Sequence, residues 1–357
     1  MDYRISPEDR ARFKRCRRQW DFASPQRRDL KPAASSESSS LPAALKDALA
    51  VYYYPGTWDW QHDLKQSLVH KALRRALDDA DALDELASGT TLIDSYDAWA
   101  VTVDDFAPVK IEQEIAALVR DPADPERGLL TADGSGVTYT CRVDLLAVDA
   151  ADEYWVVRHR IVDDWRPVEE LLLDEEATAA CWAWEQDYIG MEIAGTIHNE
   201  IRLEGPRDFP VGEPAATGSS IPVAQHEPSG GGRSIPQHAR VTAHDSRPCD
   251  GGRIEQRTAG ILRRTRVRRS RDEIAAVGRL LAAEAQEMTG ARAIYPSPGQ
   301  HCVACEFMAP CLTLYEGADP DPILEVHFHR HAGEAGRKPR LGQATWGFGR
   351  GAAPPDW

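Results

Sequence analysis

Long apolar runs are missing from this chain of 357 residues. No segment approaches the roughly 18 apolar residues that a membrane span needs, and the first residues, MDYRISPEDRARFKR, are charged. We therefore expect neither a signal peptide nor a membrane anchor. The glycine-rich loop that holds nucleotide phosphates and the G-x-S-x-G elbow of hydrolases are missing too. We therefore expect no helicase motor within the chain.

Lysine is scarce, and arginine supplies most of the positive charge: only seven of the 42 basic residues are lysines. The net charge of −15 argues against a protein that coats nucleic acid over its whole surface. Two segments are nevertheless basic. Residues 1–32 hold ten Arg or Lys against five acids, and residues 256–271 hold seven Arg and no acid. Such strips either contact a phosphate backbone or form a basic surface that is exposed to solvent.

The seven cysteines are an odd number, and without a leader we expect them in a reducing cytoplasm, where metal binding is favoured over disulfides. Cys302, Cys305 and Cys311 form a C-x2-C-x5-C run, and Cys16 lies far upstream in FKRCRRQW. Four thiolates suit an iron–sulfur cluster or a structural zinc ion. If Cys16 completes the set, one metal centre joins the first helix to the last folded segment.

Capping residues predict the starts of three helices. Ser6, Asp174 and Ser270 are each followed by helix-forming sequence, and Glu273 completes a capping box with Ser270. In the first helix, Cys16 lies on the apolar stripe and should face inward. Hydrophobic residues at 42% and charged residues at 28% are typical of a chain with a folded core.

Alternating and β-branched residues predict strands near 107–119, 137–148, 154–162 and 191–203. The pattern predicts five segments: a basic N-terminal helix (1–32), a helical region with the sheet core (42–203), a flexible insertion rich in Pro, Gly, Ser and His (204–254), a C-terminal strand, helix and cysteine run (255–316), and a disordered tail (317–357).

This order of elements, with CRVDLLAVDAADEYWVV and YPSPGQHCVACEFMAPC, resembles the RecB-like branch of the PD-(D/E)XK nuclease superfamily. The iron–sulfur members, such as AddB-type exonucleases and CRISPR adaptation nucleases, are the most similar. The resemblance spans roughly residues 1–203 and 255–315. It implies an α/β fold with a restriction-endonuclease-like mixed sheet flanked by helices. A four-cysteine iron–sulfur clasp would then join the N- and C-terminal segments.

In that family, one cysteine before the core and three after it hold a [4Fe–4S] cluster. The resemblance carries these roles to Cys16, Cys302, Cys305 and Cys311. Zinc stays open as an alternative, because the spacing of a C-x2-C pair suits either metal.

The resemblance also implies phosphodiester hydrolysis. Mg²⁺ would lie between an Asp on one strand and an acid on the next, with a Lys two residues later. Asp144 in CRVDLL matches the first acid, but Arg158 and Arg160 stand at the acid and lysine positions. Alternation places both on the face that would meet Asp144. Two guanidiniums there would repel a dication, and pair with Asp144 or reach a phosphate instead. We therefore expect a degenerate, inactive motif.

A relocated site is the alternative. Lys110, Glu112 and Glu114 alternate along one predicted strand, and if their face met Asp144 they would restore an active Mg²⁺-dependent DNA exonuclease or endonuclease. A solvated strand face is the other interpretation of the same pattern.

Other family features have only loose matches. Glu176 lies near the position of a family glutamine, without the tyrosine that should follow it. His62 or His70 matches an early histidine that some members use, although a helical histidine is more often a surface or packed residue. A further alternating set near the C-terminus would bind metal adventitiously: His327, His329 and His331.

The resemblance implies DNA as the partner, single-stranded or at an end, with a helicase or another protein partner in DNA repair or defence. The residues expected to line a DNA channel are Arg12, Lys14, Arg15, Arg17, Arg18, Arg263, Arg264, Arg266, Arg268, Arg269 and Arg271. Bases would stack on the tail at Trp346, Phe348 and Arg350 if it were ordered. Three hypotheses follow: a DNA-binding protein that does not cut, an active nuclease, and a zinc-stabilised scaffold unrelated to DNA.

Overall fold

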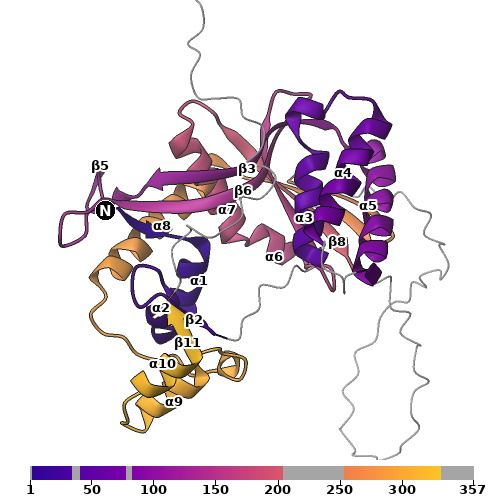
Figure 1. Ribbon diagram of the computed structural model, residues 1–357. Helices are drawn as coiled ribbons and strands as arrows, with labels where there is room; N and C mark the ends of the chain where they lie inside the picture. The colour runs from indigo at the N-terminus through magenta and orange to yellow at the C-terminus, as the bar shows by residue number, and fades with distance from the viewer. Residues whose placement is uncertain (1, 34–40, 78–82, 204–252, 331–357) are drawn as a thin grey trace, which may run out of the picture.

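A mixed sheet with helices on both faces organises the molecule (Figure 1). The computed structural model describes residues 2–33, 41–77, 83–203 and 253–330. The strands of the main sheet are β1 (Tyr3–Ile5), β3 (Phe106–Leu118), β6 (Val137–Asp149), β7 (Tyr154–Val162), β8 (Ile193–Arg202), β9 (Ile254–Ala259) and β10 (Leu262–Arg268). The four strands predicted from alternation are confirmed, as is the α/β mixed sheet flanked by helices.

The strands run in the order β1-β6-β7-β8-β10-β9, and β3 pairs along the other edge of β6. β1 with β6 and β7 with β8 are parallel pairs, and the other pairs are antiparallel. β6 is long because it has two successive partners on one side. Residues near its start pair with β1, and Leu145 to Val148 pair with β7. The sheet therefore splits at Asp144, where neither partner continues.

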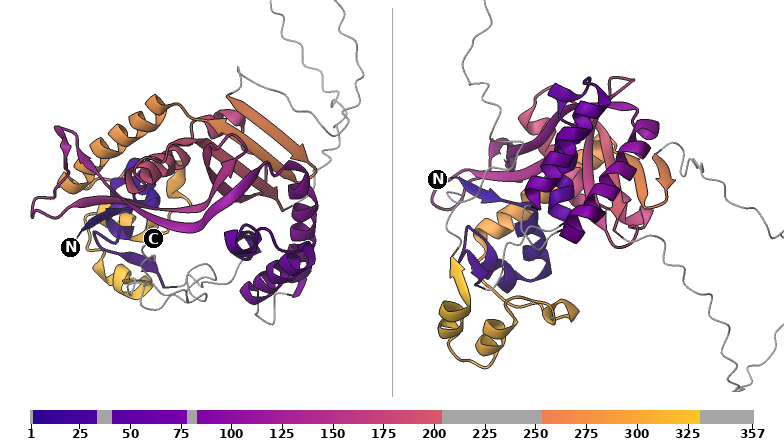
Figure 2. Two further views of the ribbon diagram at one scale, coloured as in Figure 1. Left: turned by 90° about the horizontal axis from the view of Figure 1, so that it is seen from above. Right: turned by 45° about the vertical axis from the view of Figure 1, so that its right-hand side comes forward.

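Two hydrophobic cores lie on opposite faces of this sheet. One packs α7 (Glu175–Asp187) and α8 (Arg271–Gly290) with residues of α1 (Pro7–Arg15) and α2 (Arg17–Ala23). The other packs α3 (Leu41–Tyr52), α4 (His62–Ala76) and α5 (Leu83–Val103), which stand together in Figure 2. Successive side chains of a strand point to opposite faces. His198 of β8 thus faces the α7 side, whereas its neighbours Ile197 and Asn199 face the α3–α5 side.

The N-terminal helix differs from its prediction. Cys16 has an extended backbone, with φ −161° and ψ 113°, so it ends α1 and begins α2 instead of continuing one helix. Phe13 and Trp20 remain buried on either side of this break, and Cys16 is itself buried. The inward position of Cys16 is confirmed, although the backbone reaches it differently.

The prediction of an unstructured tail from residue 317 is wrong for its first part. After α9 (Met308–Tyr315), residues 321–330 form α10 (Asp321–His327) and β11 (Phe328–Arg330). β11 pairs with β2 (Leu30–Pro32), and Phe328 stacks on Phe307 in a small core with Phe22. The chain orders here because three aromatic rings from both ends of the sequence bury one another.

The remaining elements are α6 (Val168–Leu172), the short 3-10 turns η1 (Pro55–Thr57) and η2 (Gln300–Cys302), and the hairpin of β4 (Arg120–Asp121) and β5 (Asp124–Gly128). In the part of the chain that the structure describes, no helix is long and apolar enough to cross a membrane. Residues 204–252 of the predicted insertion (204–254), and the tail residues His331, Trp346, Phe348 and Arg350, lie outside the described residues.

Candidate functional site

The four cysteines singled out from the sequence line one cavity of about 290 Å³. Cys16 reaches it from the junction of α1 and α2, Cys302 from the end of η2, Cys305 from the following turn and Cys311 from α9. The rest of the wall is mainly apolar, with Phe22, Pro296, Phe307, Met308 and Leu312. Sequence positions almost 300 residues apart are therefore brought together by the small aromatic core and by the β2–β11 pair.

Polar hydrogens approach these sulfurs. The Ser297 backbone N–H donates to Cys16 Sγ at 3.5 Å, and a guanidinium N–H of Arg18 donates to Cys311 Sγ at 3.5 Å. His301 also lines the cavity, and its Nε2 is buried without a hydrogen-bond partner in the described structure. Apolar walls with N–H donors directed at thiols suit a soft-metal centre, because such hydrogen bonds stabilise coordinated thiolates.

The described cysteines are free thiols. Among the residues that the structure describes, no three His, Cys, Asp or Glu side chains stand close enough to hold a metal ion as they are. Gathered thiols are the precondition for a metal centre, and a metal would have to draw these four closer together. The residues present fit such a group in their chemistry.

Asp144, the predicted first acid, lies where β6 and β7 separate. Its Oδ2 accepts the backbone N–H of His159 at 2.8 Å. This hydrogen bond satisfies an N–H that ladder pairing would otherwise have used, because β7 pairs with β6 only up to Val157. Asp144 therefore holds the strand at the point of divergence.

Arg158 and Arg160 lie on one face of β7, as predicted, but their partners come from α7 and its cap. Arg158 pairs with Glu176, and Arg160 Nη2 lies 3.3 Å from Asp174 and 3.9 Å from Glu176. The expectation was a salt bridge with Asp144 or contact with a phosphate. The acids at the start of α7 take its place, since they face β7 from the layer above.

Burial shifts the titration of these guanidiniums. Burial alone would lower the pKa of Arg158, but the carboxylates of Glu176 and Asp144 more than offset it and raise the pKa above its ordinary value. Burial and the neighbouring Arg158 lower the pKa of Arg160. The pKa of Asp174 falls to about 2 against the effect of burial, chiefly because Arg166 donates to it at 2.8 Å. Where an acid and a lysine were expected, the structure thus has a network of arginines paired with carboxylates at the start of α7.

The residues of the relocated site are not brought together. Lys110 donates to the Tyr188 hydroxyl at 2.8 Å and lies over its ring, on the α7 side of the sheet. Glu112 pairs with Arg142, and Glu114 is exposed. The prediction that the three share one face is wrong. Glu112, between the other two residues, has a left-handed φ of 49°, which breaks the alternation: Ile111 packs against the α3–α5 core, whereas Ile115 belongs to the α7 core.

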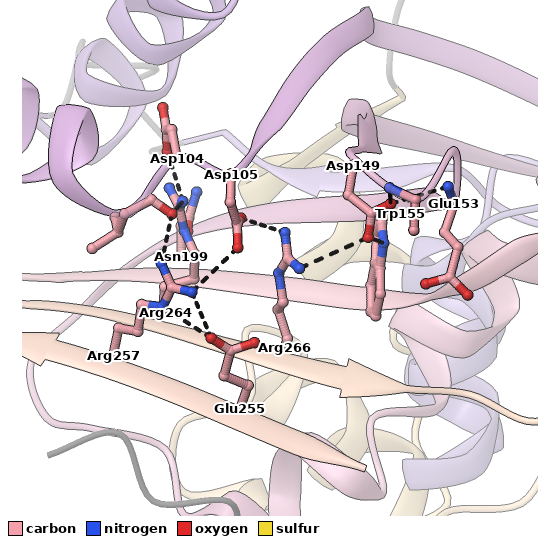
Figure 3. Close-up of polar contacts among 12 residues, drawn as sticks. Asp104, Asp105, Asp149, Glu153, Trp155, Asn199, Glu255, Arg257, Arg264 and Arg266 are labelled. Carbon is pink, nitrogen blue, oxygen red and sulfur yellow. Dashed lines mark hydrogen bonds and ion pairs between the residues drawn. The ribbon is translucent and has the colours of Figure 1, made fainter. Parts of the chain in front are cut away.

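The second basic strip is not an open basic surface. Arg264 is 2% exposed; it pairs with Asp104 at 2.6 Å and donates to Asn199 at 2.7 Å. Arg266 pairs with Asp105 and lies 3.9 Å from Asp149 (Figure 3). The other strip residues are engaged as well: Arg263 with Glu200, Arg268 with Glu153, Arg269 with the carbonyls of Leu171 and Leu172, and Arg271 with Glu185. These cations neutralise acids of the α5 end and of other segments, and a role of this strip in lining a DNA channel stays a prediction.

A buried polar network that was not predicted from the sequence lies on the α3–α5 face of the sheet. Tyr53, Tyr96 and Asn199 connect Arg264 to His159, whose ring stacks on Tyr53. The local signal in the sequence was weak: His159 and Asn199 are polar residues within the otherwise apolar strands β7 and β8.

The histidines considered for the early family position lie away from this network. His62 contacts Asp97 at 2.7 Å, and His70 contacts Asp94 at 2.8 Å. His327 and His329 are exposed.

No family model matches this chain, and no curated protein matches it. Among solved structures, a chain titled "Crystal structure of SSO0001" is 8% identical with a TM-score of 0.21. The match covers 43% of this chain and 61% of that one, so less than two thirds of that chain is spanned. A similarity this low carries no argument about fold or function.

Proposed function

We propose that this protein is a RecB-like PD-(D/E)XK nuclease-fold protein that holds a [4Fe–4S] cluster and binds DNA, single-stranded or at an end, without cutting it. The absence of cleavage is proposed from one observation. Arg158 and Arg160 pair with Glu176 and Asp174. These arginines occupy the positions where the family places an acid and a lysine.

Mg²⁺ binding requires hard oxygen ligands and tolerates little positive charge nearby. Here the nearest carboxylates are already paired with guanidiniums, and Asp144 accepts a backbone hydrogen bond. A guanidinium stays protonated, so it cannot take a lysine role that requires a neutral amine. The arrangement therefore supports phosphate contact more than hydrolysis.

For the cluster, Cys16, Cys302, Cys305 and Cys311 would be the ligands, with Ser297 and Arg18 donating hydrogen bonds to two of the sulfurs. A bound cluster would supply a covalent connection between the α1–α2 junction and the C-terminal segment. The mainly apolar wall of the cavity, with Phe22, Phe307 and Leu312 among its residues, would surround the cluster.

Anaerobic purification with iron and sulfide assays tests the cluster. We expect a brown protein with a broad absorption near ~400 nm. Iron and absorption should be lost in Cys302→Ser and kept in Cys249→Ser, which changes a cysteine outside the described residues. A colourless wild-type protein with stoichiometric zinc would contradict the cluster and favour the zinc-stabilised scaffold.

Incubation with Mg²⁺ and end-labelled single-stranded and duplex DNA tests the absence of cleavage. We expect bound DNA and no product, because the metal site lacks its second acid. Product formation that Asp144→Ala abolishes, and that the exposed-site variant Asp164→Ala retains, would show instead the alternative function of an active Mg²⁺-dependent DNA nuclease.

A further inference from the structure

A second cleft, of about 400 Å³, lies between α1 and the first turn of α7. Its charged lining residues are Arg10, Lys14 and Arg15 from α1 and Glu175 and Glu176 from α7. The cleft is distinct from the cysteine cavity and shares no lining residue with it. It touches the arginine pair of β7 through Glu176, the partner of Arg158.

The cations of this cleft are built in and only partly satisfied. Arg10 is 4% exposed; its Nε is fixed by Glu284 at 2.6 Å, while its buried Nη2 makes no hydrogen bond in the described structure and lies 3.6 Å from Glu175. Lys14 lies 3.0 Å from Glu284 and also contacts Glu175. Arg15 is exposed and has no ion pair among the described residues.

The two glutamates of α7 differ from Glu284 in how firmly they are held. The side chain of Glu284 is 14% exposed, whereas those of Glu175 and Glu176 are 46% and 43% exposed. Half-exposed carboxylates gain little from ion pairs and can turn into water at small cost. Turning Glu175 away leaves Arg10 Nη2, Lys14 and Arg15 around one space, and turning Glu176 away uncovers Arg158.

We propose that this cleft binds a backbone phosphate of a single nucleic-acid strand, and that Glu175 and Glu176 occupy it in the free protein as internal competitors for that phosphate. The inference rests on the proposed DNA binding, which it deepens by naming the contact surface and its regulation. An arginine fork and an ammonium suit a phosphodiester oxygen, and a carboxylate is the protein's own substitute for that anion.

The test is fluorescence anisotropy of a labelled 12-nucleotide oligothymidylate with the full-length protein at several salt concentrations. We expect Glu175→Gln/Glu176→Gln to bind about three- to tenfold more tightly than wild type. Lys14→Gln/Arg15→Gln should bind about tenfold more weakly, and the slope of log affinity against log salt should fall by about 0.7, the contribution of one phosphate contact on a single strand.

Matched controls change the same charges elsewhere on the surface. Glu169→Gln/Glu170→Gln removes two adjacent exposed acids of α6, and Arg74→Gln/Arg75→Gln removes two adjacent exposed cations of α4. Circular dichroism of each variant confirms that it is folded.

Cleft variants that shift affinity no more than their controls would overturn the inference and leave the proposed DNA binding intact. Binding by Glu175→Gln/Glu176→Gln when wild type does not bind would support the internal competitors directly. Absence of binding by every variant would overturn both the inference and the DNA-binding half of the proposed function.

Discussion

His198 is an uncommon residue for its position, because it is fully buried in the charged layer between β8 and α7. Its Nε2 lies 3.0 Å from the Thr196 hydroxyl, and its Nδ1 is buried without a partner in the described structure. Burial lowers the pKa of His198 to about 3, since a charged ring would lose its hydration there; Asp174 opposes the shift, and Arg160 adds to it. The ring is therefore neutral in the folded protein near pH 7.

A loss of stability on mild acidification follows. In the unfolded chain the histidine takes up a proton near pH 6.5, whereas in the folded protein it does so only near pH 3. The unfolded state thus binds more protons between these values, and the free energy of unfolding falls as the pH drops through this window, by about 1.4 kcal/mol per pH unit from this group. Urea unfolding at pH 7 and pH 5 measures the effect.

His198→Gln should reduce this pH dependence, and the exposed-site control His329→Gln should leave it unchanged. Part of the slope should remain in His198→Gln, because burial also lowers the pKa of His159, to about 4. Equal slopes in wild type and His198→Gln would contradict a neutral, buried His198.

At the scale of elements, the C-terminal segment is attached to the molecule by a small core of its own. Phe307 is 1% exposed and lies between Phe22 and Phe328, with ring centroids 5.2 and 5.0 Å away. The segment around Cys16, in contrast, is anchored in the large core on the sheet through Phe13 of α1 and Trp20 of α2. The two halves of the cysteine cavity therefore depend on different cores.

Phe307→Ala should remove about 3–5 kcal/mol of packing energy from this small core. We expect faster hydrogen exchange in residues 300–330 while α1 keeps its protection, measured by mass spectrometry. Val326→Ala on the exposed face of α10, where the side chain is 71% exposed, is the control and should change neither region. Equal loss of protection in α1 would show that both halves share one cooperative unit.

At the scale of the whole molecule, internal pairing decides where positive charge reaches solvent. The chain carries a net charge of −15. The arginines of β10 form ion pairs with Asp104, Asp105, Glu153 and Glu200. Exposed cations remain on α1, at Lys14 and Arg15, and on α4, at Arg74 and Arg75. The phosphate contact proposed above uses the cations of α1, because these line a cleft, whereas β10 works as a structural ion-pair layer.

Local order could be predicted from the residues themselves. The strands β6, β7 and β8 follow from alternation, and the N-cap at Ser6 and the capping box at Ser270 form as their sequences predict. Such features depend on neighbours two to four positions away, so the chain specifies them before any tertiary contact forms.

Tertiary structure alone determined the partners of the charged residues and of the cysteines. The same run of arginines suits a DNA channel or a buried ion-pair layer, and only the packing of α5 against β10 placed Asp104 beside Arg264. One left-handed residue in β3, Glu112, separated Lys110 from Glu114. Cys16 lines a cavity with Cys302, Cys305 and Cys311 because aromatic rings from both ends of the chain pack together. Ion pairs and cavities depend on contacts between segments distant in sequence, so residue spacing alone does not specify them.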